Sequence, residues 1–194
     1  MGEDRVLVLK TFAAPLELRT RRTLLRQWKD SDLPAWCAMN ADAEVRRYFS
    51  ATLGFEQAVQ EAGRIRAAIA QRGWGMWALE LPGQMAFAGT VGLHVTTIDA
   101  PFVPTVELGW RLCREAWGRG LATEAAQAAM QFAFDQLQLD ELTAYTAEEN
   151  LPSQAVMQRL GMQHDAADDF DHPLIAPGQP LRRHRLFRLR RTAT

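Results

Sequence analysis

The sequence lacks the features that mark disulfide-rich, zinc-binding or membrane proteins. Its two cysteines, Cys37 and Cys113, lie far apart and belong to no CxxC or Cys/His cluster, so we expect free thiols and no metal site. No run approaches the roughly 18 consecutive apolar residues that cross a bilayer. The N-terminal segment MGEDRVLVLKTF carries acidic residues early and only a short apolar run, unlike a secretory signal. A cytoplasmic protein without a membrane partner is therefore expected.

A surplus of charge of one sign is also missing. The 22 basic and 23 acidic side chains leave a formal net charge of −1, whereas a general nucleic-acid binder usually carries a basic surplus. We therefore expect no nucleic-acid partner. Apolar residues, by contrast, make up 47% of the 194 residues, which is enough for one sizeable core. Because there is no internal repeat, low-complexity tract or long linker, residues 1–194 are expected to form a single domain.

Hydrophobic periodicity and breaker residues predict alternating strands and helices. The segment 55–72 has apolar residues at helical spacing and is followed by Gly73, and a later helix is stopped by Gly161 in the position of a C-terminal cap. Asp30-Ser31-Asp32 supplies N-cap chemistry for an earlier helix. The expected strands fall within 16–28 and at 74–81, 86–95, 105–112, 142–146 and 184–189, the further helices at 42–49, 121–137 and 153–160, and a polar loop at 165–180. This alternation indicates a mixed α/β sheet covered by helices.

The most informative segment is a strand, the tripeptide Gly118-Arg119-Gly120 and an alanine-rich helix. The start of a helix leaves about four backbone N–H groups unpaired and carries roughly half a positive charge. Glycines let a ligand approach the backbone, so this arrangement suits a phosphate or pyrophosphate, and Arg114 and Arg119 can add contacts to phosphate oxygens. Taken alone, the tripeptide is a weak signal that is more typical of a plain tight turn, and neither GxxxxGK[ST] nor GxGxxG is complete here.

The wider context resembles one family. The acetyl-CoA loop of the GNAT acetyltransferases is similar to Glu115-Ala-Trp-Gly-Arg-Gly-Leu-Ala-Thr-Glu-Ala, most of all in the branch related to ribosomal-protein N-terminal acetyltransferases. The family's NxxSxxxxxxxG helix is similar to the segment from Asn150 to Gly161. The likeness covers about residues 16–190. It implies an α+β fold, with a mixed, mostly antiparallel central sheet of about six to seven strands flanked by about four helices.

The resemblance also implies an activity, the transfer of an acetyl group from acetyl-CoA to a primary amine of a peptide N-terminus or a small molecule. In the family, the loop before the long helix binds the pyrophosphate of CoA through backbone amides, and the preceding strand lies against the pantetheine arm as a sheet edge does against an added strand. The cofactor-binding residues implied here are Leu108, Trp110, Leu112, Arg114, Trp117, Gly118, Arg119, Gly120, Leu121, Ala122 and Asn150. Glu115 stands where the family usually has Gln or Arg, which argues against a side-chain phosphate contact there. Asn150 is also interpretable as a turn or helix cap.

A base is needed because an ammonium acceptor must lose a proton before it attacks the thioester. Side chains alternate along a strand, so Val106 and its apolar neighbours share one face and Glu107 lies on the other with Arg111. Family members often place a catalytic Glu on this strand, which makes Glu107 the preferred base. The alternative is a Glu107–Arg111 ion pair at the surface of the sheet. His94, on the preceding strand, is a rival base.

The leaving thiolate of CoA benefits from a proton donor. Met157 stands where many family members have a Tyr, and Met cannot donate a proton. Ser153 is the substitute that the resemblance implies. Its other interpretation is the N-cap of the helix that follows Pro152.

The acceptor side is harder to interpret. The acidic loop Asp168–Pro173 either attracts a cationic amine or is a solvated loop, and Trp74, Trp77 and Trp110 either line a pocket or belong to the core. The missing Tyr and Glu115 keep open a second hypothesis, a CoA-binding regulatory module with little turnover. An unrelated nucleotide-binding protein would need a phosphate-binding lysine or an acidic ribose-binding residue, and neither is suitably placed. A monomer and a homodimer are both compatible with the sequence.

Overall fold

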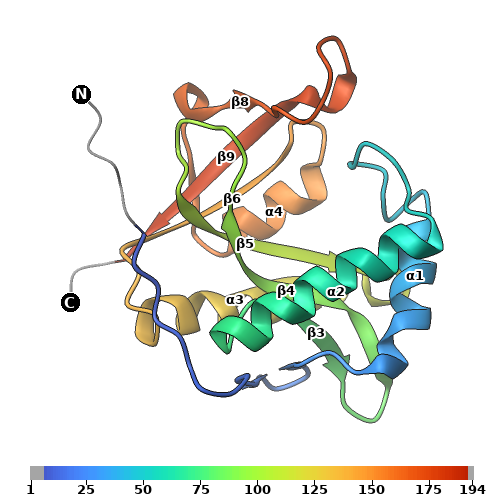
Figure 1. Ribbon diagram of the computed structural model, residues 1–194. Helices are drawn as coiled ribbons and strands as arrows, with labels where there is room; N and C mark the ends of the chain where they lie inside the picture. Colours follow the sequence, from blue (N-terminus) through green and yellow to red (C-terminus); the bar gives the residue numbers. More distant parts are fainter. Residues whose placement is uncertain (1–6, 192–194) are drawn as a thin grey trace.

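The computed structural model describes residues 7–191, in which one sheet is assembled almost in the order of the chain (Figure 1). The order of neighbouring strands is β1-β2-β3-β4-β5-β6-β9-β7, and β8 pairs with β9 outside this path. The strands are β1 (Leu18–Arg19), β2 (Leu24–Arg26), β3 (Met76–Leu81), β4 (Met85–Thr96), β5 (Thr105–Leu112), β6 (Glu141–Ala147), β7 (Gln163–His164), β8 (Phe170–Asp171) and β9 (Arg183–Arg190). The first six residues, part of the N-terminal segment considered above, lie outside the described range.

Four α-helices cover the sheet within the described range. They are α1 (Leu33–Ala41), α2 (Phe55–Arg72), α3 (Leu121–Asp135) and α4 (Leu151–Arg159). Figure 1 shows α2 lying across the middle of the sheet with α1 beside its end. On β5, Arg111 reaches Asn40 of α1 and Glu61 of α2, whereas Leu108 and Leu112 are buried in the opposite direction, where α3 contacts β4 and β5. Because side chains alternate along a strand, α1 and α2 cover one face and α3 covers the other.

The pairing of β5 with β6 sets this sheet apart. Every other pair of neighbouring strands is antiparallel in the described chain, but β5 and β6 run parallel and pair only at Glu107 and Thr143. The segment 109–112 of β5 therefore has β4 on one side and no strand on the other. This leaves the sheet open between β5 and β6.

The architecture confirms the expected mixed, mostly antiparallel sheet with four helices, although the sheet has nine strands rather than six to seven. The two additional strands, β7 and β8, contain two residues each and lie near or within the segment predicted as a polar loop. Both exist because they pair with β9. Two residues are too few to show an alternating pattern, so periodicity cannot reveal such strands.

The helix expected at 42–49 is wrong, since this segment forms turns. The carboxylate of Asp42 accepts a hydrogen bond from the amide of Glu44, which is typical of a turn. The Arg46 guanidinium donates to the carbonyl of Ala51 and the amide oxygen of Asn40. These contacts with the following segment and with α1 outweigh local helix propensity.

The N-cap prediction at Asp30-Ser31-Asp32 is only partly right. The helix α1 begins at Leu33 as expected, but the carboxylate of Asp32 makes no side-chain cap hydrogen bond to it. That carboxylate instead binds both terminal nitrogens of Arg26, at 2.8 and 2.9 Å, and both side chains are 2% exposed. A buried charge requires such a partner, so the pairing with Arg26 takes precedence over capping.

Two of the three tryptophans considered above, and the thiol of Cys37, follow the core interpretation. Trp74 and Trp77 are fully buried, so they are core residues and not pocket residues. Both indole N–H groups donate to backbone carbonyls, as buried tryptophans usually do. The two cysteines are free, with Cys37 buried and Cys113 partly buried.

Candidate active site

The glycine loop, residues 113–120, joins β5 to α3 through left-handed backbone at Gly118 (φ 70°) and Gly120 (φ 73°). This conformation is costly for residues other than glycine. In the part of the chain that the structure describes, no acceptor lies within hydrogen-bond distance of the amides of residues 118–123. A Cβ added at Gly118 would meet nothing within 4 Å. Free amides beside open space at the start of a helix form a place for an anion.

The start of α3 is fixed to the β1–β2 turn through Glu124. This carboxylate accepts hydrogen bonds from the Thr20 hydroxyl at 2.6 Å, the Arg22 amide at 2.8 Å and Arg22 Nε at 2.6 Å. Partial burial acts to raise the pKa of Glu124, but these hydrogen bonds outweigh it and lower the pKa. Arg22 also donates to the carbonyl of Arg119. The turn thus fixes the loop and neutralises the one carboxylate in the first turn of α3.

Three long side chains of the loop have partners within the chain. Trp117 Nε1 donates to the carbonyl of Leu112 at 2.8 Å, while its ring remains 46% exposed. Arg119 donates to Gln84 at 2.9 Å, and Arg114 lies 3.7 Å from the carboxylate of Asp42. The backbone amides of residues 118–120, by contrast, make no hydrogen bond within the described part of the chain.

The open edge of β5 presents backbone groups to the gap. The amide of Cys113 donates to the carbonyl of Ala88 on β4. Since hydrogen-bonding direction alternates along an antiparallel strand, the backbone groups of Leu108, Trp110 and Leu112 point the other way, towards β6. The side chains of Leu108 and Leu112 are buried, so these two residues can serve a ligand only through the backbone.

Ser153 lies across the opening from β5. Trp110 Nε1 donates to Ser153 Oγ at 3.2 Å, which leaves the serine hydroxyl proton free to point elsewhere. The prediction of Ser153 as N-cap is wrong, because α4 begins two residues earlier, at Leu151. The N-cap is Asn150, whose Oδ1 accepts from the Ser153 amide at 3.3 Å and whose Nδ2 donates to Thr146 at 2.8 Å. The cap interpretation of Asn150 is therefore confirmed.

Glu107 lies at the point where β5 and β6 pair, with its side chain 18% exposed. Its carboxylate accepts a hydrogen bond from the Thr96 hydroxyl at 3.2 Å and lies 3.8 Å from Nδ1 of His94, which is 56% exposed. The Glu107–Arg111 ion pair considered above is not formed, because Arg111 pairs with Glu61 at 3.4 Å. The neutral Thr96 hydroxyl thus holds the Glu107 carboxylate in place, and Arg111 does not neutralise its charge.

An aromatic and histidine cluster borders Glu107 on the side of β6, and the sequence analysis did not predict it. It consists of Phe102, Tyr145, Phe170, His172 and His184, with successive ring centroids 4.9 to 6.2 Å apart. Burial raises the pKa of Tyr145, and the nearby charge of Glu107 raises it further. Burial lowers the pKa of His172. These groups come from four separate segments, so only the fold brings them together.

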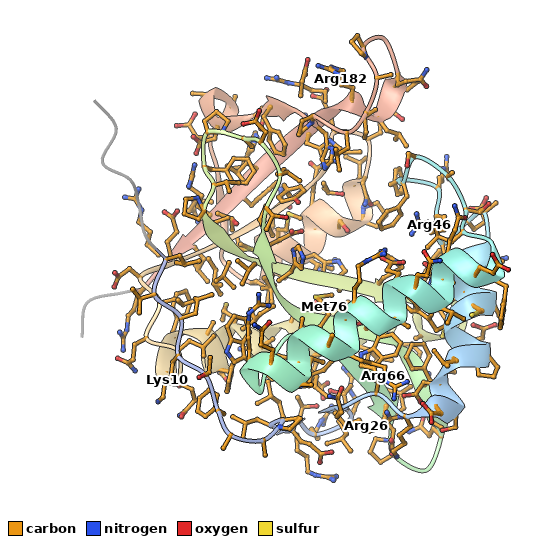
Figure 2. The ribbon with its side chains drawn as sticks, viewed as in Figure 1. Lys10, Arg26, Arg46, Arg66, Met76 and Arg182 are labelled. Atoms are coloured by element: carbon orange, nitrogen blue, oxygen red, sulfur yellow. The ribbon has the colours of Figure 1, made fainter. Side chains whose placement is uncertain are left out.

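The carboxylates of the acidic loop Asp168–Pro173 pair with side chains of the same chain. Asp168 binds Arg188 Nε at 2.6 Å, and this hydrogen bond lowers the pKa of Asp168 despite partial burial. Asp169 lies 2.8 Å from His164, and Asp171 lies 3.1 Å from Arg182. Figure 2 shows Arg182 at the outer side of this region. The loop is therefore fastened to β9 and its neighbours, and the carboxylates of Asp168 and Asp171 are paired with arginines.

Over residues 7–191, no group of three or more His, Cys, Asp or Glu side chains is arranged to hold a metal ion. None of the helices in the same range has the length and apolar character needed to cross a membrane.

Comparison with known proteins decides the family. The model of the acetyltransferase (GNAT) domain matches residues 22–163. The chain belongs to this GNAT family. Over 150 residues it is 27% identical to the uncharacterized N-acetyltransferase YoaA of Bacillus subtilis, covering 76% of this chain and 83% of YoaA.

Solved GNAT structures share the whole fold. The acetyltransferase of Agrobacterium tumefaciens superposes with a TM-score of 0.73 at 27% identity, covering 98% of this chain and all of that one (100%). RimL, a ribosomal L7/L12 α-N-protein acetyltransferase in complex with coenzyme A, superposes with a TM-score of 0.70 at 16% identity, covering 90% of this chain and 98% of RimL. The chain is thus a GNAT N-acetyltransferase that uses acetyl-CoA, with RimL among its structural neighbours.

Proposed function

We propose that this GNAT protein transfers the acetyl group of acetyl-CoA to a primary amine by direct attack on the thioester, with Glu107 as base and Ser153 as proton donor. The observation that carries the proposal is the opening between β5 and β6. Glu107 lies at its closed end, Ser153 borders it from α4, and free amides of the glycine loop lie beyond the end of β5. All three functions that the reaction needs therefore border one opening.

Acetyl-CoA is proposed to bind along this opening. The amides of residues 118–123 would hold the pyrophosphate, and the start of α3 favours its negative charge. The backbone groups of Leu108, Trp110 and Leu112 would pair with the amides of the pantetheine arm, as an added strand does. Asn150 would act indirectly, because its amide group already caps α4 and orients Ser153.

The chemistry begins with a proton transfer at Glu107. An acceptor amine is largely an ammonium ion at neutral pH, since α-amino groups have a pKa of about 8 and lysine about 10.4. The Glu107 carboxylate takes one proton, and the neutral nitrogen attacks the carbonyl carbon of the thioester. A C–N bond forms, and the carbonyl π electrons move to oxygen. The partly buried position of Glu107 keeps its charge near the amine with limited screening by water.

The tetrahedral intermediate then collapses and the C–S bond breaks. The electron pair of that bond goes to sulfur, and the Ser153 hydroxyl supplies the proton that gives CoA its thiol. The amide product loses its remaining extra proton to solvent, and Ser153 recovers its proton from water. Glu107 also gives up its proton to solvent, so one turnover releases one net proton. The indole N–H of Trp110 helps here, because its hydrogen bond to Ser153 Oγ stabilises the oxygen as the proton leaves.

One observation favours the alternative of a CoA-binding module with little turnover. Met157, at the position where many family members have a Tyr, is 2% exposed and belongs to the core. It cannot donate a proton, so transfer depends on Ser153.

The test is CoA release from acetyl-CoA with a panel of amines and N-terminal peptides, using wild-type protein and Glu107→Gln. We expect acceptor-dependent release that falls at least about 100-fold in Glu107→Gln, with acetyl-CoA affinity retained. His94→Gln, which alters the exposed rival base, is the matched control and should lose little. If His94→Gln abolishes release and Glu107→Gln does not, the base has been misassigned. Tight acetyl-CoA binding without release for any acceptor would favour the binding module.

A further inference from the structure

Two arginines meet on the face of the sheet that carries Glu107. Arg111 projects from β5 and Arg46 from the connection between α1 and α2, and Figure 2 shows Arg46 above the end of α2. Both donate to the same neutral acceptor, Oδ1 of Asn40, at 2.6 and 3.3 Å. Both also lie against the ring of Phe49, at 4.5 and 4.3 Å from its centroid.

The charge of this arginine cluster (Arg46, Arg111, Asn40 and Phe49) is not balanced. The nearest carboxylate, Glu61, lies 3.4 Å from both terminal nitrogens of Arg111, at the long limit of a hydrogen bond. Nε of Arg111 is buried without a hydrogen-bond partner among the described residues. Burial, followed by the like charge of Arg111, lowers the pKa of Arg46 to about 10. Two guanidinium groups are therefore held together with one weak counter-charge between them.

A surface depression opens beside this cluster. Its volume is about 340 Å³, and it is lined by Arg46, Leu53, Gln57, Gln60, Glu61 and Arg64. Arg64 adds a third guanidinium, so the depression and the cluster together carry three positive groups and one carboxylate. Arginine forks and side-chain amides are the donors that bind carboxylates and phosphates in proteins.

The position relative to Glu107 suggests which molecule brings the anion. Glu107 and Arg111 lie on one strand and one face, four residues apart, so their Cα atoms are separated by about 13 Å. The residue between them on that face is Gly109, and the end of the flexible Met76 side chain lies 3.5 Å from where a Cβ of Gly109 would be, so an acceptor would pass beside this thioether. An extended peptide covers this distance with about four residues.

We propose that the arginine cluster binds an anionic group of the acceptor, so that the preferred acceptor is an amine with a carboxylate or phosphate within about four residues' length. This inference rests on the proposed function, because it assumes that the amine lies at Glu107. The anion would supply the acceptor for Arg111 Nε and the missing counter-charge for Arg46. A short peptide with an acidic residue near its N-terminus fits these requirements.

The test compares matched acceptors with wild-type enzyme. The peptides Ser-Ala-Glu-amide and Ser-Ala-Gln-amide differ only in charge, and Ser-Ala-phosphoserine-amide distinguishes a phosphate from a carboxylate. We expect kcat/KM to be at least about tenfold higher for an anionic peptide, the size of one charge-assisted interaction. In Arg46→Gln and Arg111→Lys this ratio should fall towards one. Arg66→Gln is the control, since Arg66 pairs with Asp30 and lies on the other side of α2 (Figure 2).

The outcomes separate the two proposals. Equal kcat/KM for charged and neutral peptides in wild-type enzyme overturns the inference while the proposed function stands. If no peptide is acetylated, binding of the same peptides to the complex with CoA, measured by calorimetry, decides. A preference for the anionic peptides then supports the cluster as a binding site although the proposed function fails, and equal or absent binding overturns the inference. The wild-type comparison does not depend on whether the variants fold.

Discussion

Individual residues of β5 serve different parts of the site because their side chains alternate between two faces. Trp110 points to the side of Ser153 and α4, whereas Glu107 and Arg111 point to the side of α1 and α2. The strand thus separates the proposed proton donor from the proposed base and anion site. Each role can be removed by changing one side chain without moving the backbone.

Ser153→Ala tests the proton donor. The change removes the hydroxyl and leaves the amide that Asn150 caps, so α4 should keep its start. We expect kcat to fall roughly tenfold or more, because the thiolate then leaves without a positioned donor. Steady-state CoA release is the measurement, and Ser31→Ala, the same change at an exposed site, is the control. An unchanged kcat in Ser153→Ala would assign the proton to solvent.

At the scale of elements, the glycine loop and α3 form a unit that is built around left-handed backbone at two glycines. Gly118 and Gly120 both have positive φ, and Glu124 fastens the first turn of α3 to Thr20 and Arg22. The free amides are therefore held in place before any ligand arrives. This preorganisation reduces the ordering cost of binding.

Gly118→Ala separates backbone strain from ligand contact. A Cβ there meets nothing within 4 Å, so the loss of unfolding free energy should be only the strain of left-handed alanine, about 1 to 2 kcal/mol. If the open space holds the pyrophosphate, the Kd of acetyl-CoA should also rise at least about tenfold. Gly161→Ala is the matched control, with φ 80° and equally open space at the end of α4. Chemical unfolding and calorimetry provide the two readouts, and equal Kd values for both variants would contradict the assignment.

The long elements were predictable from sequence, and the short ones were not. The helix 55–72 was placed to the residue because its apolar spacing and Gly73 are both local signals. The prediction of a helix at 42–49 is wrong because the Arg46 side chain donates hydrogen bonds to Asn40 and Ala51, and local sequence signals do not show these contacts. Two-residue strands such as β8 depend entirely on their partner strand.

The site follows the same division. Alternation along β5 placed Glu107 opposite the buried residues, and the resemblance led to the glycine loop and Ser153. Sequence patterns could not predict the aromatic and histidine cluster or the contact between Arg46 and Arg111. Their members lie far apart in the chain, so no periodic spacing connects them. The N-cap was assigned to Ser153 because Pro152 is compatible with helix starts on either side of it.

At the scale of the whole molecule, a buried histidine makes stability depend on pH. His184 is 7% exposed, and its ring centroid lies 4.9 Å from that of His172. Burial lowers the pKa of His184 to about 4, opposed by a hydrogen bond to the Arg182 carbonyl and assisted by the charge of His172. The folded protein therefore keeps His184 neutral at pH values where the unfolded chain protonates it.

The consequence is a loss of stability in acid. Below pH 6.5, His184 binds a proton in the unfolded chain but stays neutral in the folded protein. The resulting loss of unfolding free energy is complete near pH 4 and amounts to at most about 3 kcal/mol. Between pH 7.5 and 4.5, the free energy of unfolding should fall in both proteins. The fall should be about 2 to 3 kcal/mol smaller in His184→Phe than in wild type. Urea unfolding at several pH values measures this. Parallel pH profiles for the two proteins would show that His184 does not control the acid response.

The order of the strands has a consequence for how the molecule is made. From β1 to β5, each strand pairs with the strand that precedes it in the chain, and only the β2–β3 connection, which contains α1 and α2, is long. The strand β6 meets β5 at a single position, after α3 has intervened. On the ribosome, one wall of the opening proposed for acetyl-CoA can thus be complete before the other emerges. The place where the sheet is open between β5 and β6 is also the place where the earlier and later parts of the chain join.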